Sequence, residues 1–213
     1  MTVFGQVDAR GVLVRRSYRL NVITLAYNAV EGVVALIAGA VAGSIALTGF
    51  GLDSLIELAA SMTALWRLRA DVRPDAREHA ERVSLRVIGV LFLALAAYVG
   101  VDAASALVRR EEPNESLAGI IIAALSVIVM PVLARAKRRV ALQLGSGALA
   151  AESEQTSLCA YLSAILLGGL LLNATLGWWW ADPVAGLVMV PIIAWEGIEG
   201  VRGRSDCDCH SRP

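Results

Sequence analysis

The chain has 213 residues, of which 57% are hydrophobic and 18% are charged, and its mean hydropathy is +0.63. Soluble domains are roughly 45–50% apolar and about 25% charged, so this composition nearly excludes a soluble globular enzyme. It also excludes a disordered chain, which would be poor in apolar residues. The net charge of zero argues against a nucleic-acid partner, and three cysteines do not make a disulfide framework. We expect the lipid bilayer to surround this protein.

Six stretches are apolar enough to cross a bilayer, for which roughly 20 residues are needed. The first two form one continuous apolar run that is broken only around Ala42, Gly43 and Ser44, which predicts a tight helical hairpin. The sequence therefore predicts an all-α membrane protein with six transmembrane helices. The expected spans are residues 21–43, 44–66, 85–108, 117–134, 148–172 and 181–200.

The basic residues are distributed unevenly over this topology. All but two of the 19 lie in the N-terminal segment, in or beside the second-to-third and fourth-to-fifth loops, or in the C-terminal tail, and Lys137 is counted in the fourth-to-fifth loop. Only Arg109 and Arg110 lie on the opposite side. Because cytoplasmic loops are enriched in Lys and Arg, we expect both termini to be cytoplasmic.

We expect three segments along the chain. They are a cytoplasmic N-terminal segment over residues 1–20, a six-helix transmembrane domain over 21–200, and a short cytoplasmic tail over 201–213. The tail carries Cys207, Cys209 and His210, a cluster that could collect a soft metal ion or could belong to an untethered tail. These ligands are too few for a folded zinc domain.

Two pairs of polar residues lie inside the expected spans. Asp53 and Glu57 are spaced i, i+4 near the middle of the second span, where a carboxylate costs about 2.5–3.5 kcal/mol on insertion scales. Gln155 and Cys159 have the same spacing in the fifth span, at a similar depth. Together they offer four ligands to a tetrahedral divalent ion such as zinc. A proton relay is the competing interpretation, and Gln and Cys in a span often serve only packing or hydrogen bonding.

Three segments resemble the cation diffusion facilitator family of transporters. Residues 44–69, SIALTGFGLDSLIELAASMTALWRLR, resemble its second span, which carries an Asp-x-x-x-Asp pair that maps onto Asp53 and Glu57. Residues 151–163, AESEQTSLCAYLS, resemble its fifth span, and residues 181–199, ADPVAGLVMVPIIAWEGIE, resemble its sixth. The resemblance implies a dimeric six-helix domain that exports zinc or a related divalent ion, such as cadmium, cobalt or iron(II), in exchange for protons.

The resemblance also shows where this chain departs from the family pattern. Gln155 stands at the usual His position and Cys159 at the usual Asp position. Gln cannot release a proton, so Glu57 and Cys159 become the expected proton-exchanging groups and Asp53 the expected metal ligand. A thiolate favours zinc, cadmium or copper(I) over magnesium or manganese. Family members often add a cytoplasmic metal-binding domain after the sixth span, which we expect to be absent here.

Further polar residues are candidates for a pathway or a secondary metal site. Glu31 in the first span could line the pathway or be neutral and hydrogen-bonded to a neighbour. Asp182 is expected to be structural, at the start of the sixth helix. The remaining candidates are Glu152 and Glu154 at the cytoplasmic mouth, and Asp71, Asp75 and His79 in the second-to-third loop, where Pro74 is expected to interrupt the helical register.

The sequence thus predicts a proton-coupled exporter of divalent cations, with zinc as the expected substrate, in the bacterial cytoplasmic membrane. We expect no prosthetic group and no enzymatic activity, because no nucleophile–base arrangement and no phosphate-binding loop is visible. Two alternatives stay open. One is a non-transporting metal sensor or partner protein of the same fold, and the other is a transporter of a different substrate that uses the acidic pair as a proton relay.

Overall fold

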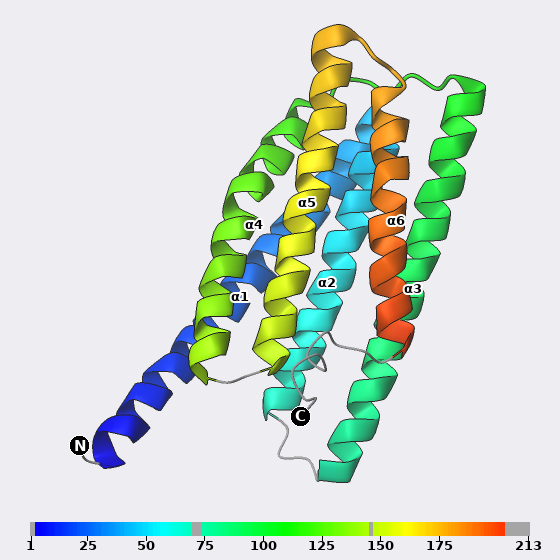
Figure 1. Ribbon diagram of the computed structural model, residues 1–213. Helices are drawn as coiled ribbons and strands as arrows, with labels where there is room; N and C mark the ends of the chain where they lie inside the picture. Colours follow the sequence, from blue (N-terminus) through cyan, green and yellow to red (C-terminus); the bar gives the residue numbers. More distant parts are fainter. Residues whose placement is uncertain (1–2, 70–73, 145–146, 203–213) are drawn as a thin grey trace, which may run out of the picture.

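The computed structural model describes the backbone of residues 3–69, 74–144 and 147–202, and the side chains of residues 12–59, 61–62, 86–144, 149 and 152–202. Helices follow one another along these ranges and run alternately up and down in one bundle (Figure 1). The fold is all-α, as predicted. The helices are α1 (Val3–Ala42), α2 (Ile45–Arg69), α3 (Pro74–Arg109), α4 (Leu117–Leu144), α5 (Gly147–Leu176) and α6 (Ala181–Arg202).

Several helices are longer than the apolar stretches that predicted them. α1 begins at Val3, so most of the expected N-terminal segment is helical, and α4 continues through the expected fourth-to-fifth loop to Leu144. Hydropathy marks the apolar part of a helix and not its ends, because helical hydrogen bonding continues into polar sequence. Pro74, which was expected to interrupt the helical register, begins α3, a position where its missing N–H removes no helical hydrogen bond. Asp71, before it, lies outside the described residues.

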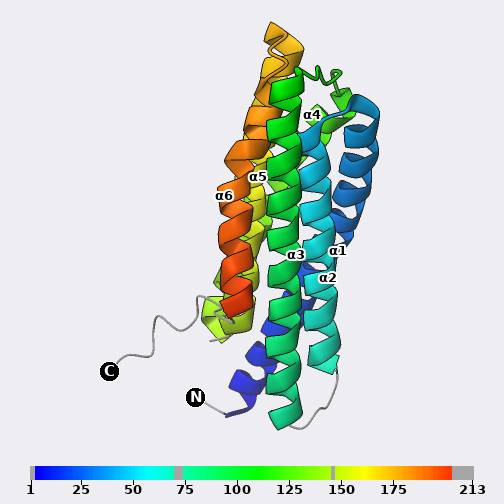
Figure 2. The same ribbon diagram turned by 90° about the vertical axis from the view of Figure 1, so that its right-hand side faces the viewer.

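Among the described residues, five helices contain a stretch long and apolar enough to cross a membrane. These stretches are Val12–Ala42, Arg86–Arg109, Leu117–Leu144, Glu152–Leu176 and Ala181–Arg202. The described part of α2, the helix that carries the acidic pair, contains no such stretch. It nevertheless lies inside the bundle, where it packs against α1, α3, α5 and α6 (Figure 2).

The hairpin predicted between the first two spans is present. Gly43 has a φ of +68°, a left-handed conformation that glycine adopts without strain, and the Ser44 N–H donates to the Gly39 carbonyl at 3.0 Å. The Ser44 hydroxyl then accepts a hydrogen bond from the Leu47 N–H at 3.1 Å and so caps the start of α2. The expected break in the apolar run is therefore a helix end followed directly by a helix start.

Asp182 has a structural role, although the helix that it caps is not its own. Its two carboxylate oxygens accept hydrogen bonds from the Ser44 hydroxyl at 2.5 Å and from the Ile45 N–H at 2.9 Å. It therefore caps α2 from the start of α6 and ties the two together.

α3 packs most extensively against α6, and the contact is close enough to need glycine. A Cβ at Gly89 would lie 2.5 Å from the Val201 nitrogen, and one at Gly197 would lie 2.8 Å from Cγ of Leu93 and 2.9 Å from the Gly89 carbonyl oxygen. The two helix backbones therefore touch at these glycines.

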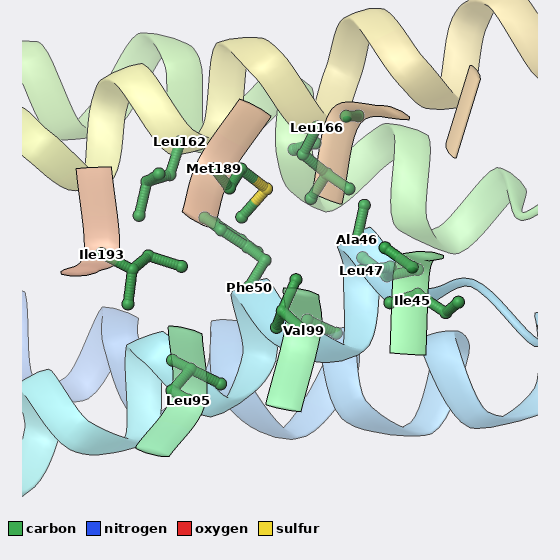
Figure 3. Close-up of a cluster of buried hydrophobic side chains, with 14 of the residues drawn as sticks. Ile45, Ala46, Leu47, Phe50, Leu95, Val99, Leu162, Leu166, Met189 and Ile193 are labelled. Atoms are coloured by element: carbon green, nitrogen blue, oxygen red, sulfur yellow. The ribbon is translucent and has the colours of Figure 1, made fainter. Parts of the chain in front are cut away.

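The hydrophobic core lies where α2, α3, α5 and α6 meet. Phe50 of α2 points between Met189 of α6 and Val99 of α3, and all three side chains are fully buried (Figure 3). Phe50 precedes Asp53 by one helical turn, and Cys159 belongs to the same buried cluster. The core thus fixes the helices that carry the candidate metal ligands.

Candidate metal site

Three of the four residues predicted as metal ligands lie together in the bundle. Asp53 and Glu57 share one face of α2, and Cys159 comes from α5. One carboxylate oxygen of each acid and the thiol sulfur all lie within 4.8 Å of one another. The three residues are only 1%, 5% and 0% exposed, so the cluster is shielded from its surroundings.

Asp53 is the least satisfied member of this cluster. Both of its carboxylate oxygens are buried, and neither has a hydrogen-bond partner among the described residues. Buried polar atoms in proteins are almost always hydrogen-bonded, because leaving one unpaired is costly. Two such oxygens on one carboxylate beside Glu57 and Cys159 form an arrangement that a cation would satisfy.

Glu57 is held in place from α1. The side-chain NH₂ group of Asn28 donates a hydrogen bond to Oε2 of Glu57 at 2.9 Å. The side-chain oxygen of Asn28, Oδ1, is buried without a partner among the described residues. The Glu57 carboxylate is therefore fixed in orientation beside Asp53 and Cys159.

Glu31 of α1 reaches the edge of the same cluster. It is fully buried, and its carboxylate accepts hydrogen bonds from the Ser54 hydroxyl at 3.1 Å and from the Ser126 hydroxyl. The Cys159 thiol also donates to Oε2 of Glu31 at a sulfur–oxygen distance of 3.9 Å. Glu31 is therefore hydrogen-bonded to its neighbours, as one of the two expectations had it, and it borders the candidate site.

The donor set suits a borderline-soft divalent ion. Zinc binds carboxylate oxygens at about 2.0–2.2 Å and thiolate sulfur at about 2.3 Å, which places neighbouring ligand atoms about 3.5 Å apart in a tetrahedron. The ligand atoms of Asp53, Glu57 and Cys159 need to close by only about 1 Å to reach that spacing.

Gln155 is the fourth predicted ligand. It lies one helical turn before Cys159 on α5 and is half-buried. Towards the start of the same helix, Glu154 is exposed, whereas Glu152 points inward and lies 3.8 Å from Nζ of Lys137.

The other predicted metal residues cannot be placed around this cluster. Asp75 and His79 belong to the first turns of α3, but their side chains lie outside the described residues. Asp71 and the tail residues Cys207, Cys209 and His210 lie outside the described residues altogether.

Two charged residues near the site were not anticipated. Lys137, assigned to a loop on the sequence, is in α4 and only 2% exposed, so that assignment is wrong. Glu196 of α6 is half-buried and close enough to interact electrostatically with Asp53 and Glu57. A carboxylate within an apolar stretch was the available signal for Glu196, the same one that identified the acidic pair.

The sequence of this helical bundle matches a known protein family. A model of the cation efflux transmembrane domain matches residues 22–202. The chain belongs to the cation efflux family. This family consists of membrane transporters and not of enzymes, and it is the family that the motifs in the second, fifth and sixth spans predicted.

A curated relative agrees with this assignment. The chain is 28% identical over 173 residues to an uncharacterized transporter of the cyanobacterium Synechocystis. The match covers 76% of this chain and 54% of the relative, so the chain spans about half the length of that relative.

Proposed function

We propose that this protein carries a divalent metal cation, with zinc as the preferred substrate, across the membrane in exchange for protons. The observation that carries the proposal is the Asp53 carboxylate, whose two buried oxygens lack a partner among the described residues while they face Glu57 and Cys159. Membership of the cation efflux family supports a cation as the transported species.

The chemistry of the cluster supports the coupling to protons. A thiol must lose its proton to become a metal ligand, so metal binding at Cys159 releases a proton. Glu57 can exchange a proton in the same way. In the proposed cycle the metal enters from the cytoplasm, binds to Asp53, Glu57 and Cys159, and leaves on the far side as protons return to the cluster.

The proposal includes the setting of the protein. α2 acts as the sixth transmembrane helix, both termini face the cytoplasm, and the membrane is a bacterial cytoplasmic membrane. The transporter works as a homodimer, as the family resemblance implies. The distribution of basic residues supports the orientation, because most of them lie towards one end of the helices.

Zinc flux into vesicles that contain the purified protein tests the function. We expect the Asp53→Asn variant, which keeps the size of the side chain but removes its charge, to lower the flux by at least about tenfold, as is typical when a metal site loses a supporting group. Glu111→Gln is the matched control, because Glu111 is exposed at the end of the bundle away from the cluster, and it should transport at the native rate.

The same vesicles separate the alternatives. Zinc flux accompanied by proton counterflow supports the exporter. Zinc binding without flux favours a sensor of the same fold, and proton flux that is independent of metal favours a relay for another substrate. Native flux in Asp53→Asn would refute the assignment of the site.

A further inference from the structure

A buried lysine lies between the candidate metal site and the end of the bundle. Lys137 of α4 is 2% exposed, whereas its neighbours Arg135, Arg138 and Arg139 on the same helix are exposed. Lysine is almost never fully buried unless it is paired. The ammonium group therefore has a specific place inside the bundle, where α4 packs against both α1 and α5.

Two partners on α5 hold this ammonium. Nζ of Lys137 donates a hydrogen bond to the Thr156 hydroxyl at 3.3 Å and lies 3.8 Å from Oε2 of Glu152. The Glu152 side chain is 19% exposed, so this pair has a buried cation and a carboxylate that reaches the surface. Its accessible member lies on the side away from the metal cluster.

The two partners of Lys137 belong to a polar stripe on α5. Glu152, Thr156 and Cys159 are spaced i, i+4, i+7 and therefore share one face of the helix. The stripe runs from the start of α5 to the metal cluster, and its last member is a candidate ligand.

A second polar stripe runs along α1. Its members are spaced i, i+3, i+7 and i+10 and are all buried: Asn21, Thr24, Asn28 and Glu31. The two stripes meet at both ends, because the Asn21 side chain interacts with the Glu152 carboxylate and Glu31 accepts from the Cys159 thiol. Together they form a line of polar side chains inside the bundle, here called the polar route, which leads from the helix ends to the candidate ligands.

The outer end of this route has more acceptors than donors. Oδ1 of Asn21 is buried without a hydrogen-bond partner among the described residues, and Oε2 of Glu152 has the Lys137 charge nearby but no hydrogen bond. Asn21 is 6% exposed, so water does not readily satisfy it. The cation that lies beside Glu152 Oε2 is the Lys137 ammonium, which belongs to the protein itself.

We propose that the Lys137 ammonium is a tethered cation that closes this route, and that a metal ion reaching the cluster from this end must first displace it from Glu152. The proposal rests on the proposed transport function. An ammonium repels an incoming cation, and separating a buried ion pair is unfavourable unless a new partner compensates each charge. Glu152 gains the metal ion, and the Lys137 charge already acts on Glu57 in the metal cluster.

The accessibility of Cys159 measures this closure directly. The double substitution Cys207→Ser and Cys209→Ser leaves Cys159 as the single cysteine of the chain. In membrane vesicles with this end outward, the rate of Cys159 modification by membrane-impermeant methanethiosulfonates reports how often the route opens. We expect Lys137→Met and Glu152→Gln each to raise that rate by about tenfold or more, the factor that corresponds to about 1.4 kcal/mol of lost closure.

The charge of the reagent separates closure from simple electrostatics. If Lys137 only repels cations, Lys137→Met accelerates a cationic reagent and slows an anionic one. If Lys137 closes the route, both reagents react faster. The exchanged pair Lys137→Glu with Glu152→Lys should restore the slow native rate with both reagents. Arg138→Met, a neighbouring exposed cation on the same helix, is the matched control and should leave both rates unchanged.

The modification rates test the closure separately from the proposed transport of metal. Unchanged modification rates in both Lys137→Met and Glu152→Gln would overturn the closure even if zinc flux is confirmed. Faster modification by both reagents would support the closure even in a protein that binds metal without moving it. If Lys137→Met fails to insert, Glu152→Gln and the exchanged pair carry the same test, because they retain a lysine in the bundle.

Discussion

Charged side chains are buried in this bundle for two different physical reasons. Lys137 is buried with partners, whereas Asp53 is buried without a hydrogen-bond partner among the described residues. The first arrangement is internally compensated and holds helices together. In the proposed transporter, a bound metal ion would compensate the second.

The sequence predicted these residues with unequal success. Asp53, Glu57 and Cys159 could be selected because polar groups inside an apolar span are rare, and helical spacing placed the first two on one face. Lys137 was misplaced because basic residues near the end of a span are normally in a loop or at the surface. Only the packing of α4 against α1 and α5 shows which face of α4 is buried.

Cys159 should set the metal preference of the site. A thiolate favours cadmium and zinc over manganese, so we expect Cys159→Asp to lower the ratio of cadmium to manganese affinity by at least about tenfold. Isothermal titration of zinc, cadmium, manganese and iron(II) into both proteins measures this ratio. The titrations use the Cys207→Ser, Cys209→Ser background so that no other thiol contributes. Identical preference in both proteins would show that Cys159 is not a ligand.

Helices were predicted more reliably as elements than at their ends. The number of described helices, the hairpin at Gly43 and the start of α6 agree with the apolar pattern. The starts of α1 and α3 and the end of α4 differ from the apolar pattern, because those turns are polar and a hydropathy pattern does not detect them. The interhelical cap formed by Asp182 on α2 was also out of reach, since it joins residues far apart in the sequence.

The contact between α3 and α6 should be the element least tolerant of larger side chains. Gly197→Leu drives a side chain into Leu93 and the Gly89 carbonyl, and overpacking of this kind costs about 1–3 kcal/mol or more. We expect a lower midpoint of thermal unfolding for the detergent-purified variant. Gly168→Leu on α5 is the control, because a Cβ there meets nothing within 4 Å and leucine favours a helix more than glycine does. Equal midpoints for the two variants would contradict this account of the α3–α6 contact.

At the scale of the whole molecule, the zero net charge conceals a strong asymmetry. Figure 1 shows the start of α1 and the end of α6 at the same end of the bundle, together with the end of α4 and the start of α3. The arginines that flank these helix ends therefore gather at one end. Lys137 no longer counts among them, because it is buried. The opposite end carries Arg109 and Arg110 beside the acids Glu111, Glu112 and Glu115.

This asymmetry predicts the orientation of the chain in the membrane. Because Lys and Arg are retained in the cytoplasm, alkaline phosphatase fused after Arg202 should be inactive, since that enzyme needs disulfides that form only outside the cytoplasm. The same enzyme inserted after Glu112, in the exposed connection between α3 and α4, should be active. A cytoplasmic reporter such as β-galactosidase should give the reverse pattern at the two sites. Phosphatase activity after Arg202 would show that the chain has the opposite orientation in the membrane. The Lys137–Glu152 pair would then lie between the metal site and the outer side of the membrane, and not between the site and the cytoplasm.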